Sequence, residues 1–228
     1  MSEYLVKSES LSAIADAIRS RSGAMGKKLN FPDGFVDEVT AISGSDNGSF
    51  RAMIERTATE ITLPSGLTKI GPFAFSNCSN LTLISLPEGL TSIENSAFSY
   101  CPNLVLTSLP KGIKRIFNST FSNCSSLALT SLPEGLTYIE SYAFNRCSNL
   151  ALTSLPEGLT GIANYAFGYC TGLTTITFEG TPGHINSSAF NSCTNLTTIN
   201  VPWAEGAVAN APWGATNATI NYNYTREA

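Results

Sequence analysis

The chain has 228 residues, of which 43% are hydrophobic and only 13% charged, so most of it is able to fold around an apolar core. Thirteen lysines and arginines against seventeen acidic residues give a net charge of -4, and no basic cluster favours nucleic acid or an anionic membrane. No apolar run approaches the roughly 20 residues that cross a bilayer, so neither membrane insertion nor an export signal is expected. One histidine and four aspartates leave little material for a hydrolase or a metalloenzyme.

The first 42 residues predict a small helical module that serves as a head or attachment unit. Hydrophobic residues fall on one helical face in two segments, residues 8–19 and residues 33–42. Residues 43–49 are polar and contain two glycines, as expected of a linker. An apolar helical face that begins at Phe50 then predicts a short helix, which would cap the open end of the region that follows.

From about residue 58 the sequence repeats every 23 residues without an insertion. The cysteines show the period: Cys78, Cys101, Cys124, Cys147, Cys170 and Cys193. Columns of leucine, isoleucine and phenylalanine keep the same step. Columns of one residue type at one spacing require stacked, equivalent coils, none of which is stable alone. Residues 50–200 therefore predict a solenoid, and residues 201–228 its C-terminal cap.

Each unit predicts one short strand of a parallel sheet. In one unit, Leu81, Ile84 and Leu86 follow an L-x-x-I-x-L pattern in which Ile84 and Leu86 point inward, and Pro87 ends the strand. Over about residues 58–201 the repeat resembles the BspA-like class of leucine-rich repeat, although glycine replaces the asparagine of more familiar repeats. The resemblance implies a mainly β solenoid of the leucine-rich-repeat type. It also implies a non-enzymatic adhesion or interaction module.

Two N-terminal segments, residues 4–19 and 31–36, resemble the beginning of tail or baseplate-associated proteins of phages and prophages of gut Firmicutes. This resemblance implies a virion component that is released by lysis, which would explain an adhesin-like repeat without an export signal. Its partners would be other tail or baseplate proteins and a protein or glycan receptor on a host cell surface, with a homo-oligomer left open. The alternative is a bacterial cell-surface adhesin.

The repeated cysteines predict buried free thiols. The sequence has no C-x-x-C pair and only one histidine, so neither a metal site nor a cofactor is expected. Equivalent cysteines in adjacent coils would lie within disulfide range. Each cysteine, however, follows a buried Ala-Phe or Thr-Phe turn, where a thiol acts as a small core residue. No pair of acids recurs as in a glycan hydrolase, so no catalytic residue is expected.

The variable positions of the repeat are candidates for partner binding. Two columns contain aromatic and basic residues: Tyr100, Arg146 and Tyr169 in one, Tyr142 and Tyr165 in the other. Tyrosine and arginine are typical of recognition surfaces, and the first column is taken as a candidate site. The alternative is that the rings cover gaps between coils. Phe117 is a further candidate, because sister units have Glu94, Glu140 or alanine at its position.

A further leucine column has two interpretations; it comprises Leu83, Leu106, Leu129 and Leu152. If the strand alternates as in the family pattern, these leucines form an exposed apolar stripe that a partner would cover. In the alternative, a shift of register buries the leucines and turns the next residues, Thr107, Thr130 and Thr153, outward. The alternative is credible because a buried threonine hydroxyl requires a hydrogen-bond partner.

Overall fold

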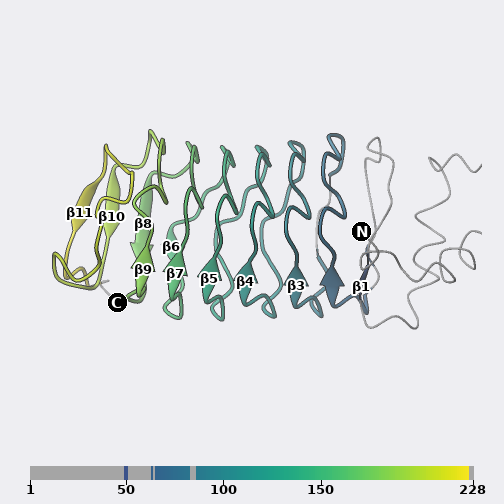
Figure 1. Ribbon diagram of the computed structural model, residues 1–228, viewed down its shortest axis with the longest axis horizontal. Coiled ribbons are helices and arrows are strands. Elements are labelled where there is room, and N and C mark those ends of the chain that lie inside the picture. Colours follow the sequence, from purple (N-terminus) through teal and green to yellow (C-terminus); the bar gives the residue numbers. More distant parts are fainter. Residues whose placement is uncertain (1–48, 51–62, 64, 83–85, 226–228) are drawn as a thin grey trace, which may run out of the picture.

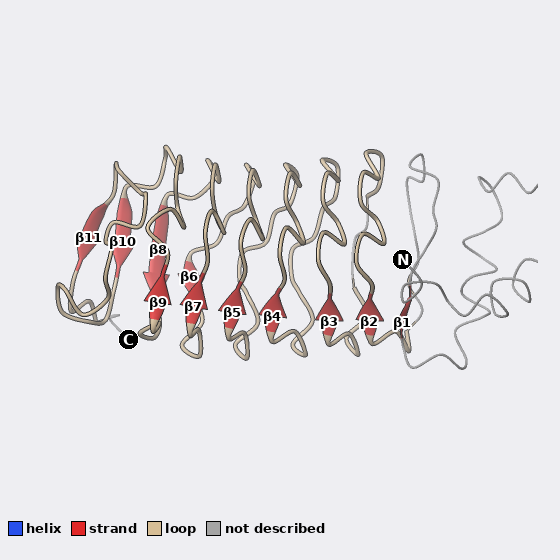
Figure 2. Cartoon of the chain, in the orientation of Figure 1, coloured by secondary structure: helices blue, strands red, loops and turns tan. Residues whose placement is uncertain are grey.

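The computed structural model describes residues 49–50, 63, 65–82 and 86–225. Within them the chain winds into a solenoid whose coils stack in one direction, towards the C-terminus (Figure 1). The described part consists of short strands and turns without a helix, and so contains none that could span a membrane (Figure 2). The predicted N-terminal module lies outside the described residues. Phe50, where we expected a capping helix to begin, lies instead in a strand.

One line of parallel strands follows the same side of every coil. Its members are β1 (Ser49–Phe50), β2 (Lys69–Ile70), β3 (Ser92–Ile93), β4 (Arg115–Ile116), β5 (Tyr138–Ile139), β7 (Gly161–Ile162) and β9 (His184–Ile185). Neighbouring strands pair in register, so that Ile70 lies beside Ile93 and Ile116 beside Ile139. The isoleucines at the ends of β2 to β9 on this line are buried and form one wall of the core. The line divides between β3 and β4 into two sheets.

A further parallel sheet lies in the C-terminal coils of the described part. It contains β6 (Ser154–Leu155), β8 (Thr175–Phe178), β10 (Thr198–Asn200) and β11 (Thr219–Asn221). The predicted strand with inward residues at alternate positions is present in β8, where Ile176 and Phe178 are buried and both threonines are half-buried. The coil of β6 has Leu-Thr-Ser at this place and forms a strand of two residues, and the two coils before it carry the same three residues. The predicted strand is absent from the described residues there.

The leucine column adopts the shifted register. Leu106, Leu129 and Leu152 have exposed fractions of 0%, 0% and 2%, so the interpretation of these three residues as an exposed stripe is wrong. The next residues are exposed instead: Thr107, Thr130 and Thr153. Leucine loses nothing polar on burial, whereas a buried hydroxyl must be paired, and this difference selects the register. Leu83 lies outside the described residues.

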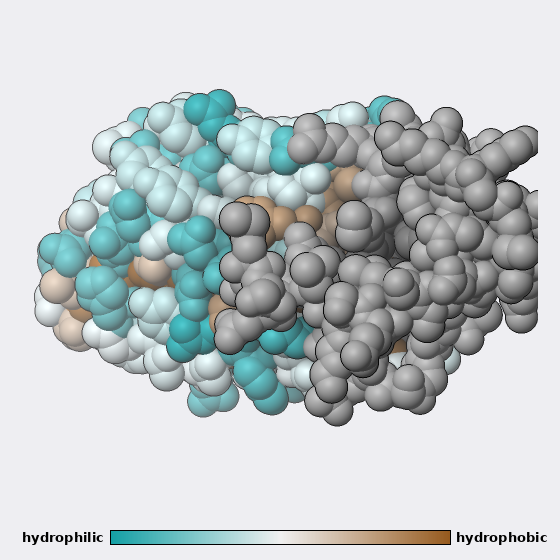
Figure 3. All heavy atoms as spheres, turned by 45° about the vertical axis from the view of Figure 1, so that its right-hand side comes forward, coloured by the Kyte–Doolittle hydropathy of each residue, from teal (hydrophilic) through white to brown (hydrophobic). Residues whose placement is uncertain are grey.

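The surface agrees with this burial. On the face seen in Figure 3, hydrophobic residues of the described coils show only as small patches among hydrophilic and near-neutral ones. The three leucines therefore belong to the interior that the isoleucine strands line.

A stack of phenylalanines fills the opposite side of the core, where each coil makes a six-residue turn. Successive rings lie with their centroids between 5.0 and 5.7 Å apart and almost parallel. The stack comprises Phe75, Phe98, Phe121, Phe144, Phe167 and Phe190. Backbone hydrogen bonds hold the turns in step: the amides of Phe75 and Asn77 donate to the carbonyls of Ala97 and Ser99 in the next coil. Ring stacking and the amide ladder therefore enforce the same spacing.

Two tryptophans cover the C-terminal end of the stack. The Phe190 amide donates to the Trp213 carbonyl at 2.9 Å, and the Trp213 indole donates to the Ala209 carbonyl at 2.7 Å. Trp203 packs edge-on against Phe178, with centroids 5.2 Å apart. Both tryptophans are buried, so the last coil closes the apolar interior that an open solenoid would expose.

Candidate binding surface

The six cysteines form a buried row in the core. All six are free and buried, as the sequence predicted. The Cys101 thiol donates to the Phe75 carbonyl at 2.9 Å, and Cys124 donates to the Phe98 carbonyl at 3.0 Å. The same bond recurs at Cys147, Cys170 and Cys193. No cluster of His, Cys, Asp or Glu among the described residues could hold a metal ion. The thiols therefore act as small core residues, and five of them donate to a backbone carbonyl of the preceding coil.

Burial should keep these thiols unreactive. It raises the pKa of Cys124 and of Cys193 from 9.0 to about 12. Because the thiolate is the reactive form, we expect iodoacetamide to label no cysteine of the native protein between pH 7 and 9. Mass spectrometry after labelling in denaturant should count six. Rapid labelling of any cysteine in the native protein at pH 8 would contradict the buried row.

The same shift predicts how stability depends on pH. The unfolded state loses its thiol protons at a lower pH than the folded state does, so stability is fully present below the ordinary thiol pKa of about 9 and is lost as the pH rises towards 12. Denaturant midpoints measured at pH 7, 9 and 11 should therefore be lower at pH 11.

Two positions of the turn have a left-handed backbone, with φ between 50° and 63°. The first position holds Phe73, Ser96, Ser119, Tyr142 and Tyr165. The second holds Asn77, Tyr100, Asn123, Arg146, Tyr169 and Ser192. Residues with a Cβ adopt this conformation at an energetic cost, and asparagine tolerates it better than most. The backbone conformation therefore costs little at Asn77 and Asn123, whereas tyrosine and arginine at these positions need another explanation.

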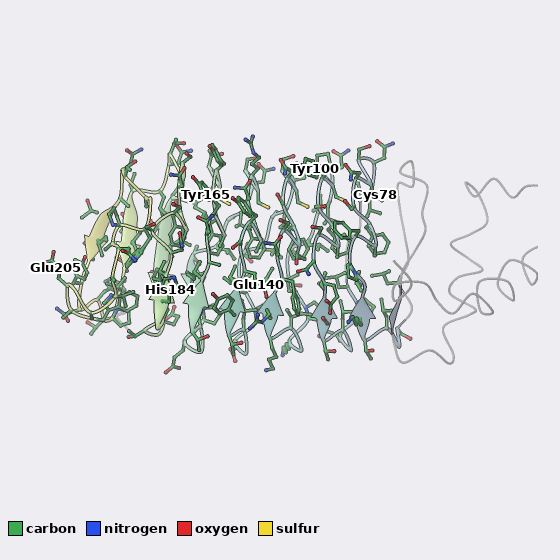
Figure 4. The ribbon with its side chains drawn as sticks, viewed as in Figure 1. Cys78, Tyr100, Glu140, Tyr165, His184 and Glu205 are labelled. Atoms are coloured by element: carbon green, nitrogen blue, oxygen red, sulfur yellow. The ribbon has the colours of Figure 1, made fainter. Side chains whose placement is uncertain are left out.

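The bulky residues at these positions face solvent. Exposed fractions are 56% for Tyr100, 40% for Tyr142 and 42% for Tyr169, and Arg146 is also exposed. Figure 4 shows Tyr100 and Tyr165 on the turn side of the solenoid, away from the strands near which Glu140 and His184 lie. Tyr165 is half-buried. Rings that are partly exposed fit both interpretations from the sequence, a recognition surface and rings that cover gaps between coils with their hydroxyls in water.

Four of these side chains form two contact pairs across two neighbouring coils. We call them the turn ridge: Tyr142, Arg146, Tyr165 and Tyr169. The rings of Tyr142 and Tyr165 are parallel to within 2°, with centroids 5.6 Å apart. The Arg146 guanidinium carbon lies 4.8 Å from the Tyr169 ring centroid, as in a cation–π contact. Gly168 leaves room for this arrangement, because a Cβ there would lie only 2.9 Å from the Tyr165 ring.

The structure brings Arg146 and Tyr169 together and adds Tyr142 and Tyr165, which the sequence showed only as a second column. Tyr100 occupies the same backbone position as Arg146 but lies two coils away. Both columns keep the 23-residue step, so the sequence places Tyr142 beside Tyr165 and Arg146 beside Tyr169 in neighbouring coils.

Phe117 lies apart from the ridge, next to strand β4. The Arg115 guanidinium carbon is 6.0 Å from the Phe117 ring centroid and 5.0 Å from that of Tyr138. Arg115 also forms an ion pair with Glu140 at 2.7 Å. Because Glu140 already neutralises this arginine, Phe117 belongs to a surface of paired charges.

Arg146 differs from Arg115 in its electrostatic surroundings. Among the described residues, ion pairs are formed by Lys69 with Glu94 and by Arg115 with Glu140, and none involves Arg146. The turns themselves cover residues 72–77, 95–100, 118–123, 141–146, 164–169 and 187–192. Within those six turns Arg146 is the one charged residue. The turn ridge therefore presents a single uncompensated positive charge beside three phenol rings.

Comparison with known proteins identifies the repeat. The family model described as "BspA type Leucine rich repeat region" matches in six copies, over residues 49–170 and 127–207. The chain belongs to the BspA-type leucine-rich repeat family. This result confirms the resemblance seen in the repeat sequence. The family match does not include the N-terminal segments that resemble tail proteins.

Several leucine-rich repeat proteins of known structure are similar to this chain. A leucine-rich repeat protein of T. pallidum is 26% identical with a TM-score of 0.56, covering 67% of this chain and 75% of that protein. A leucine-rich repeat protein from Eubacterium ventriosum is 23% identical with a TM-score of 0.50, covering 69% and 47%. A leucine-rich cell surface protein from Faecalibacterium prausnitzii is 23% identical with a TM-score of 0.41, covering 63% and 54%. This chain thus spans about half of the last two. Among curated proteins, none matches.

Proposed function

We propose that the protein is a non-enzymatic binding module that recognises its partner through the turn ridge. The observation that carries this proposal is the placement of tyrosine and arginine at exposed, left-handed positions of the turn. The coil stack does not require them, since serine and asparagine occupy the same positions in neighbouring coils. Bulky residues kept in an unfavourable backbone conformation on the surface indicate a role outside the fold.

The bacterial cell surface is the proposed location. A BspA-type repeat implies an adhesin or interaction module, and stacked repeats present equivalent positions side by side to a partner. The phage-tail interpretation depends on residues 4–36, which lie outside the described part of the chain, and no comparison supports it. The adhesin is therefore the function that we carry forward.

Binding by the full chain to extracellular surfaces tests the proposal. Labelled protein would be titrated onto immobilised extracellular-matrix proteins, glycan arrays and cultured epithelial cells. The test variant combines Tyr142→Ser, Tyr165→Ser and Tyr169→Asn, each of which introduces a residue that another coil carries at that backbone position. We expect it to lose affinity for the bound surface at least about tenfold, roughly 1.4 kcal/mol, because it removes three contact rings.

The melting temperature of the triple variant should stay close to that of the wild type, since all three changes follow the repeat. Tyr224→Ser serves as the matched control, because Tyr224 is an exposed tyrosine away from the turns. It should leave binding unchanged. Equal binding by the triple variant and the wild type would show that the turn ridge is not the recognition surface.

A further inference from the structure

The charge of Arg146 indicates the chemistry of the ligand. Its guanidinium carbon lies 4.8 Å from the Tyr169 ring centroid, a cation–π contact that uses none of the N–H donors. Within the described residues the Arg146 side chain has neither an ion pair nor a hydrogen bond. The protein as a whole carries a charge of -4, so the cation stands out from its surroundings. A planar fork of free N–H donors suits a carboxylate, which it binds through two parallel hydrogen bonds.

The residues that follow Tyr165 and Tyr169 at the same positions of the next coil are small. Tyr142 lies against one face of Tyr165, and Arg146 lies against one face of Tyr169. On the other side, the residues 23 positions further on are Ser188 and Ser192. The row of large side chains therefore ends at two serines, and each tyrosine keeps one face beside a small hydroxyl residue. A flat ligand with an apolar face and hydroxyl groups at its edge suits this combination.

The neighbours of the turn ridge favour a sugar over a protein surface or nucleic acid. The remaining residues of the two turns are Ser141, Ala143, Phe144, Asn145, Asn164, Ala166, Phe167 and Gly168, and the alanines and phenylalanines among them are buried. Ser141 and Asn164 are half-buried and offer a hydroxyl and an amide beside the rings, which suit the polar edge of a sugar, whereas Asn145 is buried. A single arginine is too little for a phosphate backbone.

Building on the proposed function, we infer that the turn ridge binds an acidic glycan. The carboxylate of a uronic or sialic acid pairs with Arg146. A sugar ring of the same chain lies on the exposed ring of Tyr169. The Ser141 hydroxyl and the Asn164 amide beside the rings bind the sugar hydroxyls.

Calorimetric titration of the full chain with matched pairs of glycans tests this inference. The acidic probes are oligogalacturonate, hyaluronan oligosaccharide and sialyllactose. Their neutral counterparts are the first two oligomers after carboxyl reduction, and lactose. We expect at least one acidic probe to bind about tenfold or more tightly than its counterpart, as a charge-assisted hydrogen-bond pair provides. This preference should shrink as salt rises.

Three variants locate the effect. Arg146→Asn should abolish the preference and keep the fold, because Asn77 and Asn123 occupy that backbone position in other coils. Tyr169→Asn should lower the affinity for acidic and for neutral probes by a similar factor. Lys111→Gln removes an exposed positive charge outside the turns and should change nothing.

Two outcomes would overturn the inference: equal affinity of the wild type for both members of every pair, or an acidic preference that survives in Arg146→Asn. In either case, a protein partner that is lost in the triple tyrosine variant would leave the proposed function standing. Failure of the triple variant to affect any binding would reject both.

Discussion

Replacing Phe121 with alanine is expected to destabilise the solenoid by about 3–5 kcal/mol. The Phe121 ring is fully buried in the middle of the stack, with centroid distances of 5.7 Å to Phe98 and 5.6 Å to Phe144. Each coil contacts only its neighbours, so a cavity here weakens the connection between the two halves of the array. Urea unfolding followed by circular dichroism would measure the loss as a lower midpoint.

Two further variants test whether the loss of stability comes from the missing ring in the core. Phe121→Leu fills most of the space and should cost clearly less than Phe121→Ala. Tyr142→Ser changes an exposed ring in the next turn and should alter stability by no more than about 0.5 kcal/mol. If Phe121→Ala had the midpoint of the wild type, the phenylalanine stack would not be the core that its burial indicates. Should the alanine variant fail to fold, the leucine variant still gives a measurable loss.

The constant 23-residue step was enough to predict the core of the repeat. Phenylalanine, isoleucine and cysteine at that step can be equivalent only in stacked coils, and the structure finds these columns buried. The strands were less predictable, because alternation depends on two or three residues in each coil. Thr175 to Phe178 alternate and form β8, whereas the order Leu-Thr-Ser gives no strand at residues 129–131 and the two-residue strand β6 one coil later.

The candidate site was predictable in part. A column that changes from Asn123 to Arg146 and Tyr169 shows in the sequence that the core does not fix this position. The left-handed backbone of that position could not be inferred, since irregular turns follow neither helical nor strand periodicity. The contact between Tyr142 and Tyr165 depends on the same backbone. Phe117 was selected because it departs from the repeat, but that departure identified a surface separate from the ridge.

Changing Leu106 and Leu129 together to serine is expected to destabilise the protein by at least about 4 kcal/mol, because each change removes buried apolar volume and places a hydroxyl in the core. Both leucines are fully buried. Val105→Ser is the matched control, since Val105 precedes Leu106 and is 43% exposed. It should change stability by no more than about 0.5 kcal/mol. Thermal and urea unfolding would measure all three proteins. If the double variant were as stable as the wild type, the interpretation of these leucines as an exposed stripe would be correct.

A change of register in one coil tests the cause of this burial. Leu129→Thr combined with Thr130→Ile gives the coil that contains these residues the order Thr-Ile that β8 has at Thr175 and Ile176. An apolar side chain then stands where strand alternation points inward, and the threonine points outward. We expect the double change to recover most of the stability that Leu129→Thr alone loses, because the buried hydroxyl is replaced by an isoleucine. If both variants were equally unstable, the position of Leu129 in the core would be fixed by the neighbouring coils and not by the order of apolar and polar residues within its own coil.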